Sequence, residues 1–152
     1  MVWWMKNNYK KIAVLNIVIP LIVGAIIYYL LSPNVIFVDV VNRIIGEGWH
    51  YPSLVKKYFI IRYIRFYFLD MLWGYSLVFT LHYFFDNNTA NLKKIFIIAF
   101  IFSVLMEVLQ VTSLTNGTFD LLDILHEFIA EVFAVFIIKN LFMRRDKNEK
   151  EN

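Results

Sequence analysis

The sequence alternates long runs of apolar residues with shorter polar segments. Four of the apolar runs are long enough to cross a membrane as helices, and they occupy residues 12–31, 66–85, 95–111 and 121–143. A helix that spans a bilayer needs about 20 mainly apolar residues. The pattern therefore predicts an all-α membrane protein, one domain over 1–152 built as a four-transmembrane-helix bundle, with a charged tail over 144–152.

Composition agrees with this class. Of the 152 residues 60% are hydrophobic, and the mean hydropathy is +0.60, which is rare for a soluble domain of this length. The sequence contains no Cys, which excludes disulfides and thiolate catalysis. Without a soluble basic face, the net charge of +3 does not point to nucleic acid as a partner. Residues 12–31 exceed the apolar core of a signal peptide and no small-x-small cleavage site follows, so this segment is expected to remain as a span.

The positions of Lys and Arg predict the orientation. With the N-terminus inside the cell, ten basic residues fall in cytoplasmic segments and five fall outside. Cytoplasmic loops carry an excess of Lys and Arg. We therefore expect both termini to be cytoplasmic, and loop 112–120, which has no basic residue, agrees.

The first outer loop, 32–65, is too long for a plain connector. Over 35–47 its polar residues gather on one helical face and its apolar residues on the other: Asp39, Asn42, Arg43 and Glu47 against Val38, Val41 and Ile45. This pattern predicts an interfacial or re-entrant helix, or equally a lid over the bundle. Trp49 and Tyr51 are expected to be interface aromatics.

Five carboxylates lie within or at the ends of the predicted spans: Asp70, Glu107, Asp123, Glu127 and Glu131. An ionised group at the centre of a bilayer costs about 3 kcal/mol or more, so each needs a partner, a wet cavity or a function. Counting about 1.5 Å per helical residue, all except Glu131 fall at nearly the same depth near the outer surface. Asp123, Glu127 and Glu131 also share one helical face.

This acidic layer supports two hypotheses. In the functional one, Glu107 is a general base with Asp123 and Glu127 as its partners, and Gln110, one turn away, donates a hydrogen bond. In the structural one, the same groups form a polar network that fastens the helices. Like charges this close must be protonated or paired with cations. A metal at these carboxylates is conceivable, but no ligand spacing specifies one, and the sequence identifies no cofactor.

Cations stand next to the second span. Arg62 and Arg65 lie on the outer side, against the usual bias, so they either pair with the buried acids or bind a phosphate or carboxylate headgroup. Asp120 is interpreted as the N-cap of the last helix. His126 is expected to be a packed polar residue rather than a ligand.

Two groups of residues carry a family resemblance. They are Glu107-x-x-Gln110 with Gly117-Thr118-Phe119-Asp120 and Asp123, and Tyr63-Ile64-Arg65 with the segment from Asp70 to Leu77. Over roughly 60–131 the chain resembles the VanZ-like membrane proteins. The resemblance assigns site positions to the residues that match its motifs: Arg65, Asp70, Trp73, Tyr75, Glu107, Gln110, Thr118, Asp120 and Asp123. Many relatives have Arg where Thr118 stands, and Asn and Gly where Glu127 and Ala130 align, so the match is incomplete there.

The resemblance implies a role in the bacterial cell envelope, with a link to resistance against glycopeptides of the teicoplanin type. The leading expectation is a protein that binds or acts on an envelope lipid or wall precursor at the outer leaflet. One alternative is an enzyme that uses acid/base or metal-assisted chemistry for transfer or hydrolysis on a lipid-linked substrate. The other is a structural subunit of a larger membrane complex, and a homo-oligomer is compatible with each of these.

Overall fold

The computed structural model describes residues 2–32, 36–46, 48–85, 91–110 and 119–150. These residues are helical or lie in short connections, and no strand occurs among them, so the all-α prediction is confirmed for this part of the chain. The elements are α1 (Val2–Leu31), α2 (Ile36–Ile45), α3 (Pro52–Lys57), α4 (Phe59–Tyr63), the π-helical turn η1 (Ile64–Phe68), α5 (Leu69–Phe84), α6 (Leu92–Gln110) and α7 (Leu121–Lys150).

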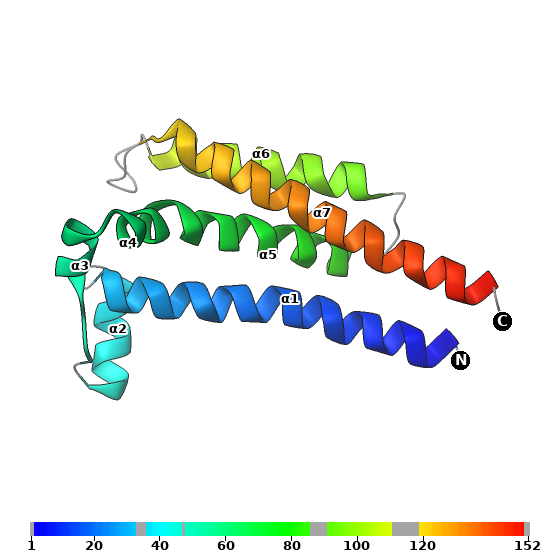
Figure 1. Ribbon diagram of the computed structural model, residues 1–152, viewed down its shortest axis with the longest axis horizontal. Coiled ribbons are helices and arrows are strands. Elements are labelled where there is room, and N and C mark those ends of the chain that lie inside the picture. The colour runs from blue at the N-terminus through cyan, green and yellow to red at the C-terminus, as the bar shows by residue number, and fades with distance from the viewer. Residues whose placement is uncertain (1, 33–35, 47, 86–90, 111–118, 151–152) are drawn as a thin grey trace.

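Four long helices run along the length of the molecule (Figure 1). α5 is central and packs against α1, α6 and α7, while α1 contacts mainly α5. The start of α1 and the end of α7 lie at the same end of the bundle, which we call the terminal end. α2 runs crosswise to α1 at the opposite end, which we call the α2 end and which also holds α3, α4 and the start of α7 (Figure 1).

The helices extend beyond the predicted spans. The second run begins well before residue 66, because α4, η1 and α5 follow one another with helical dihedral angles at their joints. α6 begins at Leu92 instead of residue 95. The charged segment predicted as a tail continues α7 as a helix as far as Lys150. Its Lys, Arg and Glu residues favour the helix because they are good helix formers.

An apolar core fills the half of the bundle nearer the terminal end. It is built from buried residues of all four long helices: Ala13, Val78, Phe79, Leu92, Ile95, Ala99, Ala134 and Ile138. The small residues let the helices approach closely. α5 and α7 approach closely at Gly74, where an added Cβ would lie 3.3 Å from the Glu127 carbonyl oxygen. The buried acids lie in the other half of the bundle, while the buried His82 lies in the same half as the apolar core.

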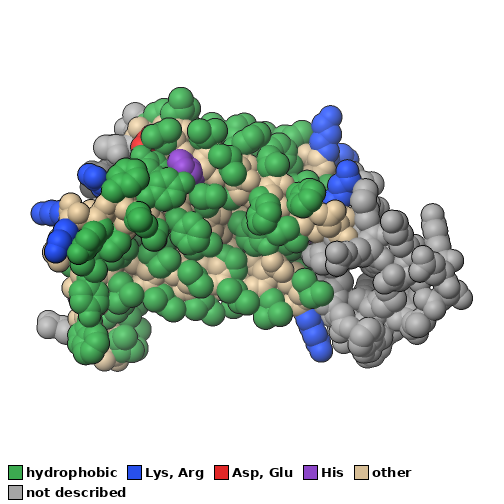
Figure 2. All heavy atoms as spheres, viewed as in Figure 1, with side chains coloured by type: hydrophobic (Ala, Val, Ile, Leu, Met, Phe, Trp, Pro, Cys, Tyr) green, Lys and Arg blue, Asp and Glu red, His purple; other side chains and the backbone are tan. Residues whose placement is uncertain are grey.

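The outer surface of the bundle is strongly apolar. On the face shown in Figure 2, hydrophobic side chains cover the middle, and Lys and Arg side chains lie toward the two ends. Among the described residues, one helical segment, Lys10–Leu31, has both the length and the apolar composition needed to cross a membrane. α5 is 16 residues long, and α6 and α7 include charged residues: Lys93, Lys94 and Glu107, and Asp123, Glu127 and Glu131.

A hydrogen-bonded ring fastens the crosswise helix to α1. The Tyr29 hydroxyl donates to Asn42 Oδ1 at 2.7 Å, and the Asn42 amide lies 3.3 Å from His50 Nε2. His50 Nδ1 donates to the Tyr29 carbonyl oxygen at 2.9 Å, because a carbonyl only accepts. Each hydrogen-bond donor in the ring thus faces an acceptor. The helix predicted over 35–47 is present as Ile36–Ile45, with Val38 buried and Ile45 69% exposed, and its interfacial placement stays a prediction.

Candidate functional site

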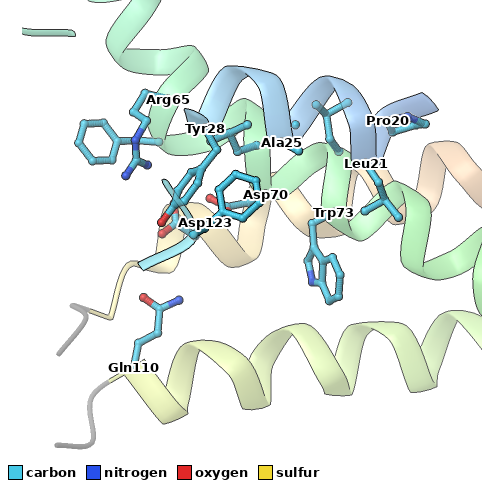
Figure 3. Close-up of a pocket in the computed structure, with 14 residues that line it drawn as sticks. Pro20, Leu21, Ala25, Tyr28, Arg65, Asp70, Trp73, Gln110 and Asp123 are labelled. Atoms are coloured by element: carbon cyan, nitrogen blue, oxygen red, sulfur yellow. The ribbon is translucent and has the colours of Figure 1, made fainter. Parts of the chain in front are cut away.

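A pocket of about 820 Å³ lies in the angle between α1 and α5, next to the end of α6 (Figure 3). Its wall combines an apolar flank with a polar end, and it is formed by Pro20, Leu21, Gly24, Ala25, Tyr28, Phe37, Arg65, Phe66, Leu69, Asp70, Leu72, Trp73, Gln110 and Asp123. Its size falls in the usual range of ligand pockets, about 300–1,000 Å³. Residues far apart in sequence meet here, including five that sequence analysis assigned to the site: Arg65, Asp70, Trp73, Gln110 and Asp123.

Arg65 reaches the pocket from a π-helical turn. η1 contains one residue more than a regular α-helical turn. The side chains after it are therefore rotated about the helix axis by one residue position. The Arg65 guanidinium lies over two aromatic rings, 4.9 Å from the centroid of Tyr28 and 5.2 Å from that of Phe66. No described carboxylate forms a salt bridge with it, although it acts electrostatically on Asp70. Its fork of N–H donors is therefore available to a ligand, and the alternative of direct pairing with a buried acid is not the arrangement seen.

Two carboxylates face the pocket. Asp70 in the first turn of α5 and Asp123 in the first turn of α7 both line it, and Asp123 acts electrostatically on Asp70 (Figure 3). Asp123 Oδ1 is buried and accepts no hydrogen bond from the residues that the structure describes. A buried oxygen of this kind favours a ligand that brings a donor or a cation.

Glu107 is engaged in fastening two helices. It is 4% exposed, and its Oε1 accepts a hydrogen bond from Gln110 Nε2 at 2.5 Å, as the sequence predicted. Its Oε2 accepts one from the Asp120 backbone N–H at 3.3 Å, which ties α6 to the start of α7. Asp120 in turn caps α7, since its Oδ1 accepts from the Leu122 N–H at 2.9 Å, so the N-cap prediction is confirmed. Both carboxylate oxygens of Glu107 are thus occupied, and Glu107 does not line the pocket.

Glu127 and Glu131 lie deeper along the same face of α7. Glu127 is 5% exposed and Glu131 is fully buried. The Ser103 hydroxyl of α6 donates to Glu131 Oε1 at 2.9 Å. One oxygen of each carboxylate has no hydrogen-bond partner among the described residues. Glu107 and Asp123 act electrostatically on Glu127, and the catalytic role of the three acids stays a prediction.

Other predicted site residues lie away from the pocket. Arg62 is exposed, 5.9 Å from the centroid of the Phe59 ring. The Tyr75 hydroxyl donates to Asn16 Oδ1 and so joins α5 to α1. Thr118 falls outside the described residues. His126 is a packed polar residue, as expected, because it stacks on Tyr67 with ring centroids 4.7 Å apart and bonds through Nδ1 to the Leu122 carbonyl.

Sequence reasoning missed the contribution of α1 and α2. The apolar flank of the pocket comes from α1, from Pro20 to Tyr28, and Phe37 of α2 approaches Tyr28 with ring centroids 6.1 Å apart. Apolar residues in a predicted span carry no chemical signal, so only the packing of α1 on α5 reveals them. In the described part of the chain no group of three or more His, Asp and Glu residues is arranged to hold a metal ion.

Comparison of the chain with protein-family models, with curated proteins and with solved structures finds no match in any of the three.

Proposed function

We propose that this chain is a VanZ-like membrane protein of the bacterial cell envelope that binds the phosphate-bearing headgroup of a lipid or lipid-linked wall precursor at the outer leaflet. The single observation that carries the proposal is the pocket itself, in which an unpaired Arg65 guanidinium stands at one end of an apolar wall. A guanidinium fork matches a phosphate in geometry and charge. An amphiphile with one anionic end and a long chain fits such a wall.

The placement of the pocket supports a lipid as the ligand. Several of its residues are also exposed on the outside of the bundle: Leu21 and Trp73 are 41% exposed, Phe37 is 43% exposed and Phe66 is 49% exposed. The apolar wall is therefore continuous with the apolar outer surface. If that surface faces hydrocarbon, a lipid chain can enter the pocket without crossing water.

The proposed topology has α1, the run from α4 to α5, α6 and α7 as four spans with both termini in the cytoplasm. The apolar belt between two charged ends supports this arrangement. The aromatic and basic residues at the α2 end, Trp49 and Arg62 among them, suit the headgroup region. In this topology α2 lies in the outer interface.

The proposal also includes a connection to glycopeptide resistance of the teicoplanin type.

Lipid binding tests the proposal directly. The full chain, purified in detergent, is titrated with a polyprenyl phosphate and with phosphatidylglycerol, and bound lipid is counted by native mass spectrometry. Arg65→Gln should weaken the binding of both lipids about tenfold, since it removes a charge-assisted contact to phosphate. Arg62→Gln is the matched control because Arg62 is exposed and outside the pocket, and it should leave binding unchanged. Equal affinities for wild type and Arg65→Gln would contradict the proposal.

A second candidate function, an enzyme acting on the same lipid, is favoured by the two carboxylates of the pocket. Asp123 is the acid best placed to exchange a proton with a bound headgroup, because it faces the pocket and keeps one unpartnered oxygen. Incubation with a radiolabelled polyprenyl phosphate or diphosphate would reveal products. Turnover that is lost in Asp123→Asn while lipid binding persists would establish the enzyme, and binding without any turnover would leave the lipid-binding function alone.

A further inference from the structure

The charges that line the pocket do not match a simple phosphate. One guanidinium, that of Arg65, faces the ligand together with two carboxylates, those of Asp70 and Asp123. Two more acids, Glu107 and Glu127, act electrostatically on Asp70 from behind the wall. A phosphate bound at Arg65 would meet this acidic wall with only the Arg65 charge to offset the repulsion. A ligand that also carries a positive charge would be drawn to both parts of the pocket.

Arg65 acts electrostatically on Asp70 but forms no salt bridge with a described carboxylate. Arg65 is held at the side of Tyr28 and Phe66 by stacking over their rings. In Figure 3 Asp70 and Asp123 lie together beyond Tyr28, and Gln110 points toward them from the end of α6. The Gln110 amide is fixed by its bond to Glu107, and Asp123 Oδ1 is buried without a donor. The acidic part therefore has accepting capacity and lacks a cation.

We infer that the headgroup recognised here is zwitterionic, a phosphate that binds Arg65 joined to a primary ammonium group that binds between Asp70 and Asp123. This inference rests on the proposed function and specifies the class of lipid. An ammonium group offers three donors, which suit the unpartnered Asp123 oxygen and the Asp70 carboxylate. The chemistry is that of an aminoalkyl phosphate, present in phosphatidylethanolamine and in free phosphoethanolamine.

Two lipids with the same chains separate the inference from the proposed function. Native mass spectrometry of the full chain is carried out with dioleoyl phosphatidylethanolamine and dioleoyl phosphatidylglycerol, and in a third arm with free phosphoethanolamine. Wild type should bind the ethanolamine lipid about tenfold more tightly than the glycerol lipid, the change that one charge-assisted hydrogen bond gives. If the lipid is the ligand, free phosphoethanolamine should bind far more weakly than the ethanolamine lipid. If free phosphoethanolamine instead binds as tightly as the lipid and competes with it, the headgroup alone is the ligand.

Substitutions assign the two ends of the headgroup. Asp123→Asn and Asp70→Asn should each remove the preference for the ethanolamine lipid and leave affinity for the glycerol lipid unchanged or higher. Arg65→Gln should weaken both lipids. Asp39→Asn, which changes an exposed acid of α2 outside the pocket, is the matched control and should keep the preference.

The zwitterionic inference and the proposed function would be overturned by different results. Equal binding of both lipids by wild type, or equal weakening of both by Asp123→Asn, would overturn the zwitterionic inference and leave the proposed function in place. Absence of binding for either lipid, or binding that ignores Arg65→Gln, would overturn the proposed function as well. Thermal unfolding of each variant in detergent shows whether it is folded, and Asp70→Asn and Asp123→Asn provide independent tests should one of them unfold.

Discussion

The buried carboxylates of this bundle differ in what their oxygens contact, and this difference separates fastening residues from residues free to bind. Glu107 accepts hydrogen bonds from Gln110 and from the Asp120 backbone, and Glu131 accepts one from Ser103. The bonds from the Asp120 backbone and from Ser103 join α6 to the α7 segment, whereas the bond from Gln110 lies within α6. Asp123 lines the pocket with one oxygen unpartnered. The acidic layer is therefore both a helix fastener and part of a pocket, with different residues in each role.

Removal of the Ser103 hydroxyl should destabilise the bundle. Ser103→Ala leaves Glu131 Oε1 without its donor in a fully buried position, and an unsatisfied buried group costs about 1–3 kcal/mol. Ser76→Ala is the matched control, since the buried Ser76 hydroxyl donates only to Leu72 in its own helix. Chemical unfolding in detergent should show a clear loss for Ser103→Ala and little for Ser76→Ala. Equal losses would mean that the bond to Glu131 does not fasten the helices.

At the scale of elements, the central position of α5 depends on how closely its neighbours approach it. α7 crosses α5 at Gly74, and the Cα and Cβ of Glu127 lie 3.4 Å from the place a Cβ would take. α1 is farther away at Gly24, where the nearest atoms are the ends of Leu72 and Leu69 side chains at 3.8 and 3.9 Å. The contact at Gly74 is with the backbone of α7. A Cβ at Gly74 can therefore be accommodated only if one of the two helices moves.

A paired glycine substitution tests this difference. Gly74→Ala should be less stable than Gly24→Ala by about 1–3 kcal/mol, the usual cost of overpacking. Both changes place Ala in a helix and gain the same intrinsic propensity, so the comparison isolates the contact between α5 and α7. Thermal unfolding in one detergent measures it. A Gly24→Ala variant as unstable as Gly74→Ala would refute the close approach.

The crosswise helix should be released by breaking its polar ring. Asn42→Ala removes the acceptor for the Tyr29 hydroxyl and the partner of His50 Nε2. Amide hydrogen exchange over α2 should speed up, while exchange in α5 and α6 stays at its wild-type rate because they make no contact with the ring. Arg43→Ala, at an exposed position of the same helix, is the control and should leave exchange unchanged.

Sequence reasoning recovered the elements that carry a repeating pattern and missed those that do not. The long apolar runs predicted the four long helices. The spacing of Glu107 and Gln110 predicted their hydrogen bond, and the position of Asp120 predicted its N-cap, but the bond between Glu107 and the Asp120 backbone was not predicted. The π-helical turn at Arg65 has no residue signature, since any helical sequence can form it. The α1 wall of the pocket was not predictable because Leu21 and Ala25 look like any lipid-facing residues until α1 is packed on α5.

At the scale of the whole molecule, both ends of the chain lie at one end of the bundle and the pocket lies near the other. The apolar core occupies the half near the chain ends, and the acids occupy the half near α2. If the bundle spans a membrane, this division places the pocket in one leaflet. The distribution of Lys and Arg predicts that this leaflet is the outer one.

Cysteine labelling tests the topology. The sequence has no Cys, so a single added Cys can be labelled without background. Asn116→Cys should react with an impermeant maleimide added to intact cells, since its loop is predicted to face outward, and Lys147→Cys should react only after the cells are opened. Labelling of Asn116→Cys only in opened cells would place the pocket in the inner leaflet.

An experimental structure of the chain in a lipid nanodisc tests most directly whether the pocket holds a lipid headgroup at Arg65. We expect density for a headgroup phosphate within hydrogen-bonding distance of the Arg65 guanidinium, about 3 Å, with an acyl chain along Leu21 and Ala25 of α1. A pocket closed by direct pairing of Arg65 with Asp70, with lipid density elsewhere, would contradict it.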